Sequence, residues 1–298
     1  MARRRLITVA TALLALSACG SSNPSNASGS HSPSPVGTSP PHITIDAKEY
    51  AFTLPAQIPA GWVDVTLHNS GKVGHQIAFA KLGPVSFAAF ETAASATDVK
   101  ALAGVRFVGG PNDVDPGSSV TAVVHFDPGA YGVACFIPDD KDGKPHAEHG
   151  MVGQVDVVRT AASVDDPPKV DGGSITLSEF TFLPDASFTG TGTVEIKNVG
   201  TQVHELIVVK EAPGKSLADV KAFFLAPPGT PSPGTALPAG PPPFTSAGGI
   251  VGLGPNQTAY QTMALTPGKY VLLCLFPDPT KRNMPHALEG MIKEITIS

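Results

Sequence analysis

Each half of this chain contains the same set of side chains that could hold a metal ion. In each half a cysteine is followed by a Pro-His-x-x-x-Gly-Met tail and preceded, far upstream, by a histidine on an apolar stretch. The four donors are His75, Cys135, His146 and Met151 in the first half, and His204, Cys274, His286 and Met291 in the second. Two imidazoles, one thiolate and one thioether are the donors of a trigonal His₂Cys copper site with a weak axial methionine. The sequence therefore predicts two mononuclear copper sites, one copper ion per half and up to two in the chain.

The mixture of soft sulfur and nitrogen donors suits an ion that changes its oxidation state. Cuprous ion favours soft sulfur and cupric ion favours nitrogen, so a rigid mixed set makes the two states similar in geometry. The cysteine must bind as a thiolate, so metal binding should release a proton and weaken in acid.

Other interpretations of the same residues stay open. A histidine or a cysteine on an apolar strand is usually a core residue without a metal. Zinc also accepts a His₂Cys set. A disulfide between Cys135 and Cys274 is conceivable in an exported protein. It is less favoured because each thiol belongs to its own copy of one motif.

The first nineteen residues are typical of an export signal. Arg3-Arg4-Arg5 precedes an apolar stretch from Leu6 to Ala18, which is too short to span a membrane. The segment Leu16-Ser17-Ala18-Cys19 resembles the lipobox of bacterial lipoproteins, although an ordinary secretory signal is the alternative. We expect lipidation at Cys19 and a place on the extracytoplasmic face of the cell membrane. Residues 20–41, rich in Ser, Pro and Gly, then form a disordered tether.

The charge of the chain limits the classes of partner that it is expected to bind. The formal net charge is −5, and no basic run follows the export signal. A nucleic-acid partner is therefore not expected. The expected partners are the membrane, through the lipid anchor, and a redox partner or a copper donor or acceptor in the cell envelope.

An internal repeat sets the domain organisation. Glu49-Tyr50-Ala51-Phe52 parallels Glu179-Phe180-Thr181-Phe182, and Asn69 and Asn198 each stand six residues before their histidine. Two copies of this length indicate domain duplication. The predicted domains are residues 42–159 and 171–298, joined by a linker over 160–170.

Hydrophobic patterns predict an all-β fold with a short helical insertion in each domain. Residues 63–68 and 193–197 alternate apolar and polar side chains, as half-buried strands do. Residues 131–136 and 270–275 are apolar runs expected to be strands that carry the cysteines. Helices are expected around 97–103 and 216–225. Short strands between frequent turns favour antiparallel β-sandwiches.

With these motifs in place, both halves resemble cupredoxins, the blue-copper family. The His-Ala-x-x-Gly-Met ending is most similar to that of rusticyanin and sulfocyanin. The resemblance implies two tandem cupredoxin-like Greek-key sandwiches in which the eight donors above form two type 1 copper sites. Ten residues separate Cys135 from His146, and eleven separate Cys274 from His286. These loops are longer than in familiar members. The extra residues either turn outward and leave the ligands together, or disturb the site.

Several copper enzymes of this fold are not expected here. The chain lacks the His-x-His and His-Cys-His patterns of a trinuclear cluster, and neither cysteine has an adjacent histidine. We therefore expect no enzyme. The leading hypothesis is a membrane-anchored carrier of single electrons. The alternatives are copper capture or delivery without redox cycling, and a metal-free binding module of the cell envelope.

Some nearby residues receive lesser roles. His149 and Met284 are possible rival ligands, but neither keeps its place in both copies, so each is interpreted as part of the rim. Asn69 and Asn198 are expected to be turn residues, or to brace the cysteine loop. The Pro-rich insertion at 227–243 is expected to be an extended surface loop.

Overall fold

The computed structural model describes residues 39–225 and 241–298. The predicted export signal, its Cys19 and nearly all of the tether lie outside these residues, as does most of the Pro-rich insertion. By its contacts, the chain from residue 38 to residue 298 forms one compact unit. Within the described ranges, no helix is long and apolar enough to cross a membrane.

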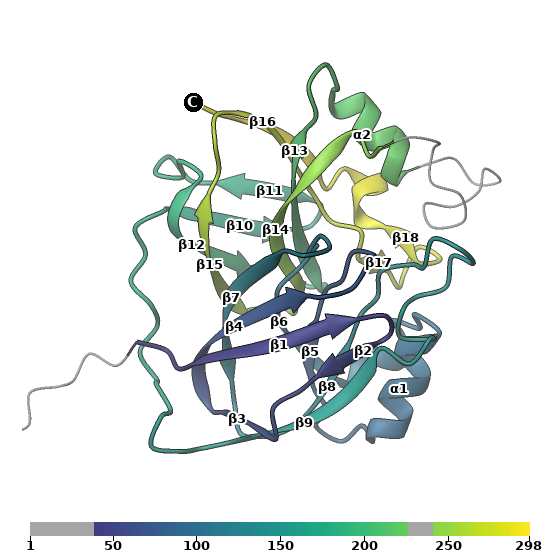
Figure 1. The fold of residues 1–298 in the computed structure, drawn as a ribbon, viewed down its shortest axis with the longest axis vertical. Helices are drawn as coiled ribbons and strands as arrows, with labels where there is room; N and C mark the ends of the chain where they lie inside the picture. Colours follow the sequence, from purple (N-terminus) through teal and green to yellow (C-terminus); the bar gives the residue numbers. More distant parts are fainter. Residues whose placement is uncertain (1–38, 226–240) are drawn as a thin grey trace, which may run out of the picture. The chain divides into compact units, whose positions relative to one another are not determined.

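The first repeat supplies strands β1 to β9 and two short helices (Figure 1). Their bounds are β1 His42–Lys48, β2 Ala51–Thr53, β3 Gln57–Pro59, β4 Gly61–Asn69, β5 Ala78–Lys81, α1 Phe87–Ser95, η1 Ala101–Gly104, β6 Arg106–Gly109, β7 Ser119–Phe126, β8 Gly129–Ala134 and β9 Val152–Val158.

The second repeat supplies β10 to β19, again with two short helices. Their bounds are β10 Ser174–Ser178, β11 Thr181–Pro184, β12 Thr191–Asn198, β13 His204–Glu211, α2 Leu217–Phe224, β14 Phe244–Leu253, β15 Thr258–Ala264, β16 Gly268–Leu273, β17 Pro277–Asp278, β18 Met284–Pro285, η2 His286–Glu289 and β19 Ile292–Ile297.

The fold is mostly β, and two large sheets each run through both repeats. One sheet has the order β11-β10-β12-β15-β7-β4-β1-β2, and the other has β19-β16-β13-β14-β6-β5-β8-β9-β3. The repeats meet where β15 pairs with β7 and where β14 pairs with β6. A hydrophobic core containing residues of both repeats fills the space between the sheets. The domain limits at 42–159 and 171–298 stay a prediction.

The sheets are mixed, so the expectation of antiparallel sheets holds for most strand pairs but not for all. β1 runs parallel to β4, β10 to β12 and β3 to β9, while the other pairs between main strands are antiparallel. Alternation of apolar and polar residues predicts that a segment is a strand and which face is buried. It carries no information about the direction of the neighbouring strand.

The alternating segments are strands, as predicted. In β4 the side chains of Val63, Val65 and Leu67 are fully buried, and the residues between them are partly exposed. In β12 the buried positions are Val194 and Ile196. Each strand thus turns one row of side chains into the core.

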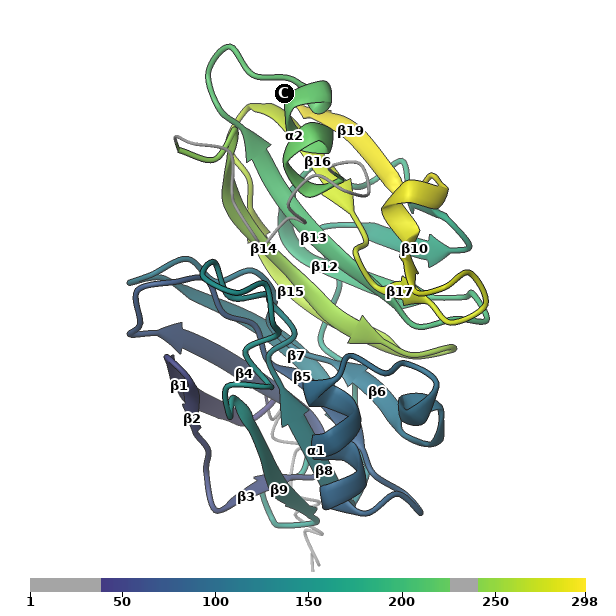
Figure 2. The ribbon, with the colours of Figure 1, turned by 90° about the vertical axis from the view of Figure 1, so that its right-hand side faces the viewer.

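The prediction for the helices is right in the second repeat and displaced in the first. Helix α2 begins after Ser216, which forms the predicted capping box with Asp219. Helix α1 instead begins after Ser86 and ends before the predicted segment, where only η1 forms. The alanine-rich sequence of α1 favours a helix, and its Phe90 is fully buried against Gly132 of β8. Figure 2 shows α1 beside β8.

Candidate metal centres

The first set of donors comes from three separate segments. His75 lies in the connection after β4, where its backbone exchanges two hydrogen bonds with Val114, at 3.1 and 2.8 Å. Cys135 is the first residue after β8, and His146 ends the loop that follows it. One ligand atom from each of these three side chains lies within 4.8 Å of the others, and all three are buried. The Sγ atom of Cys135 is 3.4 Å from Nδ1 of His146.

The second set repeats this arrangement. His204 is the first residue of β13, Cys274 follows β16, and His286 begins η2. Their ligand atoms also lie within 4.8 Å of one another and are buried. The two Nδ1 atoms of His204 and His286 are 3.1 Å apart, and the sulfur of Cys274 is 3.5 Å from Nδ1 of His286. Two imidazole nitrogens and a sulfur therefore face one small volume.

Each methionine is tied by its backbone to the other donors. The N–H of Cys135 donates to the carbonyl of Met151 at 3.1 Å, and the N–H of Met151 donates to the carbonyl of His146 at 2.9 Å. Met291 makes the same two bonds in the second repeat, at 3.1 and 3.0 Å. Both methionines are fully buried.

The glycine before each methionine has a conformational role. Gly150 has φ = 99° and Gly290 has φ = 113°, values that side chains with a Cβ rarely adopt. This residue ends the helical turn begun by the histidine and reverses the chain. The Gly-Met pair of the motif is thus explained by the backbone path.

The long cysteine loops turn outward and leave the ligands together. In the first repeat the N–H of His146 donates to the carbonyl of Ile137 at 2.9 Å, and the N–H of Ala147 donates to that of Cys135 at 2.9 Å. In the second repeat the N–H of Ala287 donates to the carbonyl of Cys274 at 2.8 Å. The corresponding loop of the second repeat forms the two-stranded β17–β18 pair. Each loop is therefore a hairpin whose base holds the cysteine next to the histidine.

Buried imidazole nitrogens without partners test whether a metal ion fits. Nδ1 of His75 has no hydrogen-bond partner among the described residues, and Nδ1 of His146, of His204 and of His286 lies against another donor of its own set. An unpaired buried polar atom costs about 1–3 kcal/mol. A metal ion would offset this cost, because a neutral imidazole donates its lone pair to the ion. The donor set fits copper, with zinc as the chemical alternative.

The protonation states of the histidines suit ligands. Burial, followed by repulsion from the neighbouring histidine, lowers the pKa of His146 and of His286 to about 4. Both rings are therefore neutral at pH 7. Burial raises the pKa of the Cys135 thiol to about 12, so metal binding at this site has to displace a proton.

A glutamate stands behind each upstream histidine. Nε2 of His75 is 3.7 Å from Glu49, and Nε2 of His204 is 3.8 Å from Glu179. Although burial opposes it, hydrogen bonds from the backbone of residues 201 and 202 hold the pKa of Glu179 at about 2. A carboxylate near the outer nitrogen favours ligation through the inner nitrogen. The two glutamates occupy matching positions in the repeats, but no role was predicted for them from the sequence. Their presence in both repeats was the signal that could have indicated one.

The asparagines brace the histidine connection and not the cysteine loop. Nδ2 of Asn69 donates to the carbonyls of Val73 and Val114, at 2.8 and 2.7 Å, and its Oδ1 accepts from the N–H of Gly71. Asn198 makes the same three kinds of bond in the second repeat.

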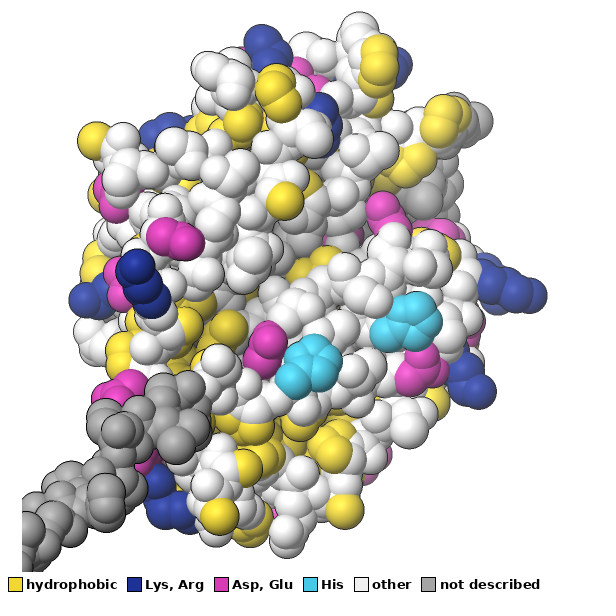
Figure 3. Space-filling view, turned by 60° about the vertical axis from the view of Figure 1, so that its left-hand side comes forward, with side chains coloured by type: hydrophobic (Ala, Val, Ile, Leu, Met, Phe, Trp, Pro, Cys, Tyr) yellow, Lys and Arg dark blue, Asp and Glu magenta, His cyan; other side chains and the backbone are white. Residues whose placement is uncertain are grey.

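The rival ligands lie outside both donor groups. His149 is exposed and lies 3.3 Å from Asp142, and the side chain of Met284 is 40 % exposed. Figure 3 shows two histidine side chains on the surface beside acidic ones. The four donor histidines are not among them, because each is at most 1 % exposed.

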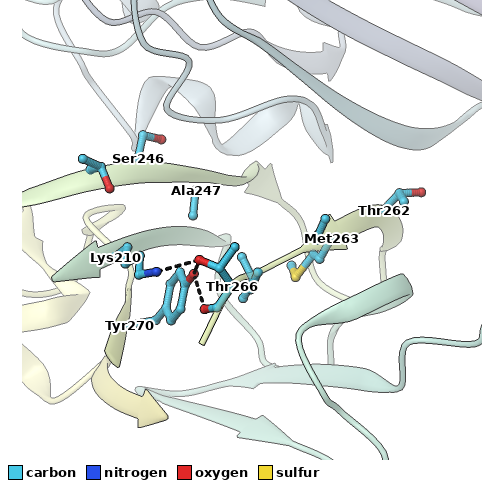
Figure 4. Close-up of a pocket in the computed structure, with 10 residues that line it drawn as sticks. Lys210, Ser246, Ala247, Thr262, Met263, Thr266 and Tyr270 are labelled. Atoms are coloured by element: carbon cyan, nitrogen blue, oxygen red, sulfur yellow. Dashed lines mark hydrogen bonds between the residues drawn. The ribbon is translucent and has the colours of Figure 1, made fainter. Parts of the chain in front are cut away.

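A hollow lies towards the end of β13 that is distant from His204, and none of the proposed metal donors lines it (Figure 4). Lys210 there donates to Oγ1 of Thr266 at 2.6 Å, and the hydroxyl of Tyr270 donates to the carbonyl of Thr266 at 2.9 Å. Lys210 is six residues after His204 on β13, a distance of about 20 Å along a strand. This hollow is therefore separate from the candidate metal centre.

Comparisons with known proteins found likenesses only among solved structures. No family model and no curated protein matches the chain. Auracyanin from Roseiflexus castenholzii is 22 % identical with a TM-score of 0.29, and the match covers 39 % of this chain and 96 % of that one. Auracyanin A, a blue copper protein from Chloroflexus aurantiacus, is 19 % identical with a TM-score of 0.29, over 41 % and 100 %. Copper nitrite reductase from Nitrosomonas europaea is 15 % identical with a TM-score of 0.23, over 86 % and 93 %. At these TM-scores, neither family nor metal is inferred from the likenesses.

Proposed function

We propose that each repeat is a cupredoxin-like sandwich that binds one copper ion, and that the protein carries single electrons. The observation that supports this most strongly is the convergence of two imidazoles and one sulfur within 4.8 Å in each repeat. His75, Cys135 and His146 would hold one ion, with Met151 as the axial donor. His204, Cys274, His286 and Met291 would hold the other.

Copper would supply a centre that gains and loses one electron, and the protein would keep the donor positions nearly constant between the two states. The hairpin bases, the asparagine braces and the glycine turns all fix the backbone of the donors. The side chains around each centre exclude water, because every donor residue is at most 1 % exposed. Rigid, dry donors favour electron transfer over ligand exchange.

Copper titration of the purified protein tests this function. We expect intense visible thiolate-to-copper absorption that saturates at up to two copper ions per chain, and reversible reduction in voltammetry. Tight cuprous binding with poorly reversible voltammetry would instead indicate copper capture or delivery. Absence of copper binding, with an unchanged melting temperature, would leave the metal-free binding module. A tightly held zinc ion that copper does not displace would contradict the copper assignment.

The methionines offer a matched pair for the same titration. Met151→Leu removes a proposed axial donor while keeping the size of the side chain, so it should shift the absorption and the reduction potential of one site. Met284→Leu changes an exposed methionine in the cysteine loop of the other repeat and should leave both spectra unchanged. Equal effects of the two substitutions would argue against an axial role for Met151.

We also propose that Cys19 is lipidated and anchors the protein on the extracytoplasmic face of the cell membrane. The Leu-Ser-Ala-Cys sequence after a short apolar stretch supports this. Mass spectrometry of the mature N-terminus should find a lipid-modified cysteine. Cys19→Ser should move the protein from the membrane fraction to the soluble one, and wild-type protein without a lipid would contradict the proposal.

A further inference from the structure

A cavity of about 660 Å³ lies between the two repeats, beside both candidate metal centres. Phe136, which follows the first cysteine, lines it, and so does Phe276, two residues after the second cysteine. Glu205, the neighbour of an upstream histidine, lines it too. Cavities of this volume are typical of sites for small organic molecules.

The walls of this cavity are largely apolar and include several aromatic rings. Five phenylalanines from both repeats line it: Phe136, Phe223, Phe224, Phe244 and Phe276. The ring of Phe244 lies 4.8 Å from that of Phe224 and 5.0 Å from that of Phe223. Aromatic faces carry negative partial charge and attract organic cations.

Three acids are among the polar residues that line the cavity: Asp140 is exposed, whereas Glu205 is buried and Asp113 partly buried. Oδ1 of Asn112 and Oδ2 of Asp113 are buried and have no hydrogen-bond partner among the described residues. Asn112 is 1 % exposed and its amide nitrogen lies 3.3 Å from the carboxylate of Glu205. Glu205 is 5 % exposed and also accepts from the N–H of Leu275 at 2.8 Å. No lysine, arginine or histidine is among the described residues that line the cavity, although a buried carboxylate is costly without a cation.

The repeat itself does not require Asp113 or Glu205. Val114 and Leu253 occupy equivalent places, because each pairs with the upstream histidine of its repeat. The residue before each is therefore equivalent as well, which matches Asp113 with Gly252. Both have a left-handed backbone, with φ of 51° and 54°. In the same way, Glu205 in the second repeat corresponds to Gln76 in the first. Each acid has an uncharged counterpart in the other repeat, so neither is needed to build the metal centre.

We propose that this cavity binds a small organic cation, a protonated amine carried on an aromatic or apolar body. The ammonium group would donate hydrogen bonds to Asp113, Glu205 and the amide oxygen of Asn112, and the apolar body would lie against the phenylalanines. A lone metal ion would fill little of the volume and would leave the aromatic walls without a partner. The proposal does not depend on copper.

Calorimetric titration of the metal-free protein tests the proposal directly. 2-Phenylethylammonium should bind, and 2-phenylethanol, which has the same body and a neutral donor, should bind about ten- to a hundredfold more weakly, the worth of one charge-assisted hydrogen bond. Equal binding of the two probes would overturn the proposal. So would the absence of binding of the amine at millimolar concentration, or a heat signal with calcium ion alone.

Two isosteric substitutions locate the cation. Asp113→Asn and Glu205→Gln should each weaken binding of the amine by about tenfold or more and leave binding of the alcohol unchanged. Asn tolerates the left-handed backbone at residue 113, and the melting temperature checks that each variant folds. Asp156→Asn, on the exposed side of β9, removes a carboxylate outside the cavity and serves as the control. Wild-type affinity in both cavity variants would overturn the proposal.

Discussion

The two repeats build the same donor frame and surround it with different charges. In both, an asparagine braces the histidine connection, a glutamate stands behind the upstream histidine, and a glycine turns the chain before the methionine. The neighbour of that histidine is Gln76 in the first repeat and Glu205 in the second. Burial raises the pKa of both cysteine thiols. At Cys274 the charge of Glu205 raises the pKa further, whereas at Cys135 no charged neighbour in the described part of the chain adds to the effect of burial.

This difference distinguishes the features that a donor set requires from the neighbouring side chains that can change without disturbing it. The frame consists of backbone hydrogen bonds and of side chains that satisfy buried backbone groups, so it recurs in both copies. The charges next to it do not recur. The charges of Asp113 and Glu205 line the cavity between the repeats. A binding site there can therefore differ between the repeats without a change in either candidate metal centre.

The largest expected effect tests whether the frame is the same in both repeats. Asn69→Ala and Asn198→Ala each remove three hydrogen bonds, two of them to backbone carbonyls, so each should lower the free energy of unfolding by about 3 kcal/mol. Chemical denaturation measures the loss. Similar losses are expected. A loss below about 1 kcal/mol in one repeat would show that its connection is held by other contacts.

The helices of the two repeats pack differently, and a glycine tests this. A Cβ on Gly132 would lie 2.4 Å from the ring of Phe90, whereas the equivalent residue of the second repeat, Val271, packs with Val220 of α2. Gly132→Ala should therefore cost about 2 kcal/mol of stability by overpacking. Val271→Ala should cost about 1–2 kcal/mol by leaving a small cavity. A neutral Gly132→Ala would contradict the described position of α1.

The charge difference predicts a pH dependence of stability. Burial raises the pKa of Asp113 to about 6 from 3.8. The folded state therefore binds the proton more tightly, and the contribution of Asp113 falls as the pH rises from about 4 to above 6. Asp113→Asn should increase the free energy of unfolding at pH 8 by about 1 kcal/mol and change it little at pH 3.5. The melting temperature at the two pH values measures this difference. A variant less stable than wild type at pH 8 would contradict this sign.

The smallest expected effect concerns the reduction potentials, and it rests on the proposed copper sites. A negative charge beside a copper ion favours the cupric state, so Glu205→Gln, which removes a carboxylate, should raise the potential of the second site. Gln76→Glu should lower the potential of the first. Voltammetry of the two variants measures both changes. A reduction potential that shifts in the opposite direction in either variant would contradict the effect of a neighbouring charge. An equal shift at both sites would show that the effect is not local.

Much of the frame could be predicted from the sequence because the same residues occur in the same order in both repeats. The strands β4 and β12 followed from alternation, and α2 followed from its capping residues. The three donors that converge in each repeat, two histidines and one cysteine, share one order, and the spacing from the cysteine to the second histidine is nearly the same. The long loops left their geometry open, since a count of residues cannot distinguish an outward hairpin from a disturbed site.

What the sequence did not predict depends on partners distant in the chain. The parallel direction of β1 beside β4 and the continuation of both sheets through the two repeats depend on pairing, which alternation does not encode. The link from Asn112 to Glu205 joins residues ninety-three positions apart. Helix α1 was placed too late because the residue three after its cap Ser86 is Ala89, so the capping box that marked α2 is missing there.

Copper content and visible absorption of the single-cysteine variants test the central claim most directly. Wild-type protein saturated with copper should hold two ions, Cys135→Ser and Cys274→Ser one each with about half of the thiolate-to-copper absorption, and the double variant none. Copper that remains in the double variant, loss of both ions in one single variant that still folds, or colourless copper in the wild type would contradict two separate His₂Cys centres.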